Sequence, residues 1–126
     1  MHRSRLCAIM LDCSHNTMEA GVQFWHQALG LPVRRGENPT SPYVTLEGGV
    51  GGLQLFLQRV QDSSRIHLDI ETDDVEAEVQ RLEKLGVRRK TQVDAWWIME
   101  DPCQHLFCVV PVQSDAFAMQ AHVWED

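Results

Sequence analysis

The chain lacks long hydrophobic runs: none of its apolar stretches approaches the roughly 20 residues that a membrane-spanning helix needs. Its first residues also lack the long apolar segment and small-residue cleavage site of a signal peptide. Phosphate-binding loops, dinucleotide-binding fingerprints and nucleophile elbows are absent as well. These absences argue against a membrane partner and against the commonest nucleotide-binding and serine-hydrolase classes, and we expect a cytoplasmic protein.

Basic residues are scarce. The chain has 11 Lys and Arg against 18 Asp and Glu, which gives a net charge of −7. Nucleic-acid binding needs a clustered basic surface, so no nucleic-acid partner is expected. The four cysteines form no C-x-x-C pair, which predicts reduced and mostly buried thiols.

A hydrophobic content of 44% in 126 residues predicts one globular domain spanning residues 1–126. Its clearest segment is 65–86, RIHLDIETDDVEAEVQRLEKLG, which predicts a strand followed by a helix. Asp73 and Glu76 have the spacing of a capping box, and Gly86 suits the left-handed residue that ends a helix. An apolar stripe at helical spacing lies between them: Val75, Val79, Leu82 and Leu85.

The same unit occurs earlier in the chain. Met10-Leu11-Asp12 corresponds to His67-Leu68-Asp69, and Asn16 with Glu19 repeats the capping box before a helix at 16–29. Each half reads as β-α-β-β-β, with module one at about 5–60 and module two at about 65–111. The further strands are expected at 31–35, 43–47, 53–60, 87–91, 95–100 and 105–110. The tail, 112–126, is either a short helix covering an edge or a partner contact.

These paired modules, with YVTLEG, LQLFLQRV, the 67–86 block and DPCQHLFCVV, resemble the vicinal oxygen chelate superfamily. That group contains glyoxalases, bleomycin-resistance proteins and extradiol dioxygenases, and the similarity is greatest to its small glyoxalase-like proteins. The resemblance covers about residues 6–111. It implies an α+β fold in which the two modules form a curled mixed sheet around a cleft, and it implies a homodimer.

The resemblance also implies where a divalent metal would be held, by His, Gln or Glu from the first and last strands of each module. His67 matches one position. Met10, Phe56 or Leu57 (with Gln58 nearby) and Cys108 stand at the others, and Met is a poor ligand for Zn, Mn, Ni or Fe(II). A standard metal site is therefore predicted to be absent, with His67 a ligand only if a metal binds.

Side chains on the cleft side of the strands are the candidate site. His67 and Asp69 lie two apart on one strand and so face one side, where His67 is either a ligand or general base or a half-buried histidine paired with a carboxylate. Asp12 is the counterpart of Asp69, and such carboxylates either favour a cationic ligand or accept hydrogen bonds at a strand end. The predicted cleft residues are Asp12, Tyr43, Phe56, Gln58, His67, Asp69, Trp97 and Cys108. The aromatic members would line a pocket for a planar ligand or pack in the core.

A second motif, Cys103, His105 and Cys108, suggests a zinc site. In a strand, however, positions 105 and 108 point to opposite faces, which argues against one shared metal.

Three functions remain open on the sequence alone. One is a metal-free binder of a small molecule, like the resistance proteins. Another is a metal-dependent lyase, isomerase or dioxygenase that uses His67 with ligands such as Asp12, Gln58 and Asp69. The last is a protein-interaction domain whose cleft is vestigial.

Overall fold

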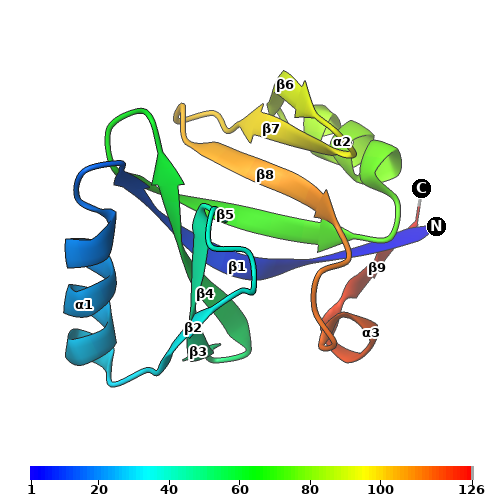
Figure 1. Ribbon diagram of the computed structural model, residues 1–126. Coiled ribbons are helices and arrows are strands. Elements are labelled where there is room, and N and C mark those ends of the chain that lie inside the picture. The colour runs from blue at the N-terminus through cyan, green and yellow to red at the C-terminus, as the bar shows by residue number, and fades with distance from the viewer. Residues whose placement is uncertain (126) are drawn as a thin grey trace. The chain divides into compact units, whose positions relative to one another are not determined.

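The computed structural model describes residues 1–125, without the side chain of Val50, and within them it has nine strands and three helices (Figure 1). Their order is β1 (His2–Ser14), α1 (Met18–Leu29), β2 (Val33–Arg35), β3 (Tyr43–Val50), β4 (Leu53–Val60), β5 (Arg65–Thr72), α2 (Val75–Lys84), β6 (Arg88–Val93), β7 (Trp96–Glu100), β8 (Leu106–Pro111), α3 (Phe117–Gln120) and β9 (His122–Trp124). The predicted α+β class and the repeated β-α-β-β-β order are confirmed. Within the described range no helix has the length and apolar character to cross a membrane.

The chain divides into two units. The central unit is Ala8–His67, and the terminal unit combines Met1–Cys7 with the residues from Leu68 onwards. In the central unit the strands are ordered β2-β3-β4-β1, with β1 and β4 parallel and the other pairs antiparallel. One face of this sheet packs against α1 through a buried cluster: Leu11, Cys13, Met18, Val22, Val44, Leu46, Leu55 and Leu57.

In the terminal unit the strands are ordered β5-β8-β7-β6, and β5 and β8 are parallel. Helix α2 covers one face through a smaller core of Val79, Leu82, Met99 and Val109 (Figure 1). Helix α2 buries Val79 and Leu82 of the predicted stripe, with Val75 packed against them, because burying such a stripe stabilises a helix of this length. Leu85, the last member of the stripe, follows the helix and is 65% exposed.

The predicted helix caps are wrong by one residue. Helix α1 has Thr17 at its N-cap with no side-chain cap bond, and α2 has Asp74, whose carboxylate accepts the Ala77 N–H at 3.0 Å. Asp73 instead accepts bonds from the backbone and side chain of Arg3, so its carboxylate joins two segments of the terminal unit. Gly86 follows α2 with φ of 102°, which fits the predicted left-handed stop.

The tail is partly helical. Helix α3 ends at Gln120, and His122–Trp124 forms strand β9, which pairs antiparallel with His2–Ser4. The tail therefore contains a short helix, one of the two expectations, followed by a strand that the sequence did not predict. The Trp124 ring lies 3.7 Å from the Arg81 guanidinium, and its N–H donates to Ser4 Oγ. These contacts keep the tail on its own unit.

Two fully buried carboxylates tie the terminal unit together. Glu71 on β5 accepts hydrogen bonds from the Arg5 guanidinium, from the backbone N–H groups of Gln113 and Ser114, and from the Ser114 hydroxyl. Glu78 on α2 has its own set of partners: His2, Ser4 and Arg81. Buried charges are tolerated only when they are paired and hydrogen-bonded. Each of these carboxylates finds its partners partly on the N-terminal strand and partly on segments far from it in the sequence, and so connects them.

Candidate functional site

The face of the central sheet that points away from α1 carries most of the predicted site. Residues directly opposite each other in a sheet face the same side. The strand register sets Asp12, Gln58 and Tyr43 in one row, and Met10, Phe56, Thr45 and Arg34 in the next. We call this the distal face, defined by Met10, Asp12, Arg34, Tyr43, Thr45, Gln54, Phe56 and Gln58. The alternation of β4 therefore puts Leu55 and Leu57 in the core and Phe56 and Gln58 on the opposite face.

Asp12 on this face is paired with His67, and both residues belong to the central unit. His67 Nδ1 lies 2.7 Å from Asp12 Oδ2, and the Arg65 guanidinium lies 3.9 Å from the same oxygen. The side chains of Asp12 and His67 are only 4% and 13% exposed. A carboxylate that accepts the Nδ1 proton fixes the tautomer of a neutral imidazole, with the lone pair on Nε2. The pair is therefore arranged for hydrogen bonding or proton transfer.

The other carboxylate oxygen, Asp12 Oδ1, is buried and has no hydrogen-bond partner among the described residues. Leaving a buried acceptor unsatisfied costs about 1–3 kcal/mol, and more for a charged group. A group bearing an N–H, O–H or cationic centre would offset that cost. This oxygen is the strongest mark of a ligand on the distal face.

Beside Asp12, the Gln58 amide donates to the Tyr43 hydroxyl at 3.3 Å, and Tyr43 is 42% exposed. Phe56 lies in the adjacent row, opposite Met10. The predicted residues Asp12, Tyr43, Phe56 and Gln58 are thus on one face, with the exposed Tyr43 ring two strands from the Asp12 carboxylate.

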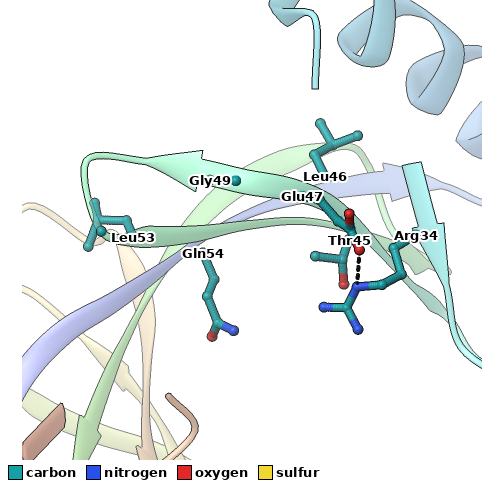
Figure 2. Close-up of a pocket in the computed structure, with 9 residues that line it drawn as sticks. Arg34, Thr45, Leu46, Glu47, Gly49, Leu53 and Gln54 are labelled. Atoms are coloured by element: carbon teal, nitrogen blue, oxygen red, sulfur yellow. Dashed lines mark ion pairs between the residues drawn. The ribbon is translucent and has the colours of Figure 1, made fainter. Parts of the chain in front are cut away.

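A pocket of about 580 Å³ lies at the β3–β4 hairpin of the same unit, within the size range of small-molecule sites (Figure 2). Figure 2 shows Arg34, Thr45 and Gln54 extending to one side of the sheet and Leu46 to the other. The pocket is lined by Arg34, Thr45, Leu46, Glu47, Gly48, Gly49, Gly52, Leu53 and Gln54. Arg34 Nε lies 2.8 Å from a carboxylate oxygen of Glu47, so the pocket contains one exposed ion pair.

The hairpin that forms this pocket depends on Gly49. Its φ is 55°, and a Cβ there would lie 1.8 Å from the Leu53 carbonyl oxygen. A side chain at this position would therefore displace the backbone that lines the pocket. In the sequence, the glycine-rich run Gly48–Gly52 is the feature that indicates such a close approach between backbone segments.

Three predicted cleft residues lie on the terminal unit: Asp69, Trp97 and Cys108. Cys108 on β8 is directly opposite Asp69 on β5, and its side chain is buried. Trp97 does not share their side of the sheet, because it packs on the α2 core opposite Val109. Trp96, its neighbour, takes the alternate side of β7.

The cysteines behave as predicted with one exception. All four are free; Cys7, Cys13 and Cys108 are buried, and Cys103 is exposed. Burial, with the nearby carboxylates of Glu71 and Asp69, raises the pKa of Cys7 to about 12, so that thiol stays protonated and unreactive. Cys103 and His105 lie in the turn before β8 begins at Leu106, whereas Cys108 is buried within that strand.

The metal positions implied by the resemblance do not fit in module one. Met10 and Phe56 are directly opposite each other on β1 and β4, and neither offers an oxygen or nitrogen donor to a hard or borderline cation. The donors nearby are one row away, at Asp12 and Gln58.

Comparison with known proteins matches residues 8–110 to the family model described as a glyoxalase-like domain. The chain belongs to this glyoxalase-like domain family. It is thereby placed in the vicinal oxygen chelate superfamily, as predicted. No curated protein matches the chain.

Several solved structures share the fold of this glyoxalase-like protein. A hypothetical protein, BH1468 from Bacillus halodurans, has a TM-score of 0.60 at 14% identity over 90% of this chain and 97% of its own. Methylmalonyl-CoA epimerase from Mycobacterium tuberculosis has a TM-score of 0.57 at 16% identity, covering 90% and 91%. A 2,2',3-trihydroxybiphenyl 1,2-dioxygenase from Sphingomonas wittichii has a TM-score of 0.57 at 15% identity, over 88% of this chain and 42% of its own. At such identities the likeness establishes the fold alone.

The residues that sequence reasoning missed are Arg34, Thr45, Glu47 and Gln54 of the pocket. The alternation of β3 and β4 already places Thr45 and Gln54 on the side of Tyr43 and Gln58. Arg34 gave no such signal, because its place depends on the register between β2 and β3.

Proposed function

We propose that this protein binds a small organic molecule that carries a cationic or hydrogen-bond-donating group at the distal face of the central unit, without the metal site of the catalytic relatives. The observation that carries the proposal is Asp12 Oδ1, a buried carboxylate oxygen with no partner among the described residues. Met10 and Phe56, at two of the implied ligand positions, support binding without a metal. We expect the protein to act as a homodimer in the cytoplasm.

The shape and chemistry of the face narrow the ligand class. Asp12 favours a cation or an N–H donor, and Tyr43 and Phe56 present aromatic surface in the neighbouring strands. Arg34 and Glu47 supply the charged groups of the hairpin pocket. A flat aromatic amine or amidine combines the features that these residues recognise.

Binding is tested with benzamidine and tryptamine, which join a cation to an aromatic ring, followed by a wider panel of amines. We expect a ligand that raises the melting temperature, and an affinity at least tenfold weaker in Asp12→Asn, because a charged hydrogen bond contributes about 1.5–3 kcal/mol. Isothermal titration calorimetry measures the affinity. Glu19→Gln, which changes an exposed carboxylate on α1, is the matched control and should leave it unchanged.

Unchanged affinity in Asp12→Asn would contradict the proposed site. If no amine in the panel raised the melting temperature, the binding function itself would be wrong, and the interaction domain with a vestigial cleft would replace it.

A metal-dependent lyase, isomerase or dioxygenase is the second candidate, favoured by the O and N donors near His67. Asp12 is within hydrogen-bond distance of that imidazole and opposite Gln58, so its carboxylate has an imidazole on one side and faces a strand that carries an amide. If such a site binds Zn, Mn, Ni or Fe(II), elemental analysis after dialysis against each ion should show near-stoichiometric metal that His67→Ala removes. His15→Ala, an exposed histidine of the same unit, should retain it. Absence of any retained metal would exclude this function in its usual form.

A further inference from the structure

The turn between β7 and β8 brings together three different metal-ligating side chains. Their donor atoms, one each from Asp101, Cys103 and His105, all lie within 4.8 Å of one another. Nδ1 of His105 is 3.0 Å from Asp101 Oδ2. This cluster belongs to the terminal unit and contains none of the distal-face residues.

The backbone of this turn is held in place from both sides. The Asp101 N–H donates to the His105 carbonyl at 2.9 Å, and the Gln104 N–H donates to the Asp101 carbonyl at 3.0 Å. Asp101 Oδ1 accepts the N–H groups of Cys103 and His105 at 2.8 and 2.7 Å. Gln104, which lies between Cys103 and His105, has a left-handed backbone with φ of 72°. The donors therefore lie on a closed five-residue turn, so binding an ion costs less conformational entropy than it would on a flexible loop.

The exposure and the types of the donor atoms suit a cation. Cys103 and His105 are exposed, so a metal ion reaches their donor atoms without any opening of the core. Thiolate, imidazole and carboxylate are the donors that zinc takes in proteins, and a tetrahedral zinc sets them about 3.3–3.8 Å apart.

We propose that Asp101, Cys103 and His105 form a surface Zn²⁺ site, with a fourth position open to water. The sequence motif included Cys108 as the third ligand, but that thiol is buried within β8. The third ligand is instead Asp101, the residue directly after β7. Three ligands from one turn make an open site, which differs from the four-ligand closure of structural zinc.

The site is tested on the full chain, reduced and freed of metal with a chelator. Titration with Co²⁺ should give one equivalent of binding and a thiolate-to-cobalt charge-transfer band in the near ultraviolet, which Zn²⁺ then displaces. We expect Cys103→Ser to abolish this band and His105→Ala to weaken Zn²⁺ binding at least tenfold. His105→Ala leaves the backbone bonds of the turn in place, so it does not depend on a variant that fails to fold.

Three variants serve as controls. His122→Ala changes another exposed histidine of the terminal unit and should bind Zn²⁺ like the parent. Cys108→Ala should keep the charge-transfer band, and losing it would restore the motif with Cys108. His67→Ala should also keep the band, which separates this site from any metal on the distal face. Absence of the band, or its survival in Cys103→Ser, would overturn the proposal.

Discussion

Replacing Glu71 with alanine is expected to lower the free energy of unfolding by about 3–5 kcal/mol, the usual cost of breaking a buried ion pair from one side. The Glu71 side chain is fully buried and ion-paired with Arg5, whose side chain is 6% exposed. Alanine would leave the Arg5 charge without that partner. It would also remove the acceptor of the Gln113 and Ser114 N–H groups. Urea unfolding followed by far-ultraviolet circular dichroism measures the change.

Glu19→Ala is the matched control, because Glu19 also pairs with an arginine but at the surface of α1. Its side chain is 62% exposed, and surface pairs contribute about 1 kcal/mol or less. Glu71→Gln should lie between the two, since the amide keeps an acceptor oxygen but not the charge. If Glu71→Ala and Glu19→Ala lowered the free energy of unfolding equally, burial would not determine how much the Glu71–Arg5 pair stabilises the protein.

Acid should weaken the terminal unit through Glu78. Burial opposes ionisation of this carboxyl, but the hydrogen bonds from Arg81, His2 and Ser4 outweigh it and hold its pKa below the ordinary 4.5. A carboxyl whose folded pKa is depressed contributes stability that is fully present above its unfolded pKa and is lost as the pH falls through its folded pKa. Stability should therefore decline below about pH 4.5, the ordinary value.

The comparison that isolates this effect is Glu78→Gln. At pH 7 the variant should be less stable by about 3 kcal/mol, because Arg81 and His2 lose their charged partner. As the pH falls from 5 to 3 the difference from the parent should shrink, since the parent carboxyl also becomes neutral. Urea unfolding at each pH gives the curve; a constant difference across that range would contradict the depressed pKa.

The repeat made most of the fold predictable from the sequence. Period-2 alternation in LQLFLQRV separates Leu55 and Leu57, which pack under α1, from Phe56 and Gln58 on the other side. Helix starts were less predictable, because two acidic residues, Asp73 and Asp74, compete for the N-cap of α2. Only the geometry decides that Asp74 caps the helix while Asp73 reaches Arg3.

The site was predictable where a strand determines it and unpredictable where tertiary packing does. Asp12 and Gln58 share a row because β1 and β4 pair in register, and the repeat already marked Asp12. Trp97 could not be assigned, since adjacent tryptophans on a strand face opposite sides and composition does not say which side is the core. The Asp101 ligand was missed because a turn, with Gln104 at positive φ, sets the position of its carboxylate.

The division of the chain into units has a consequence for its synthesis. All residues of the central unit are contiguous, from Ala8 to His67, whereas the terminal unit needs partners from both sides of that stretch. Strand β9 pairs with His2–Ser4, and Ser114 bonds to Glu71, so these contacts cannot form before Ser114 and β9 have left the ribosome. The central unit can therefore collapse first on a translating ribosome, while His2–Ser4 stays accessible to chaperones until β9 has been synthesised.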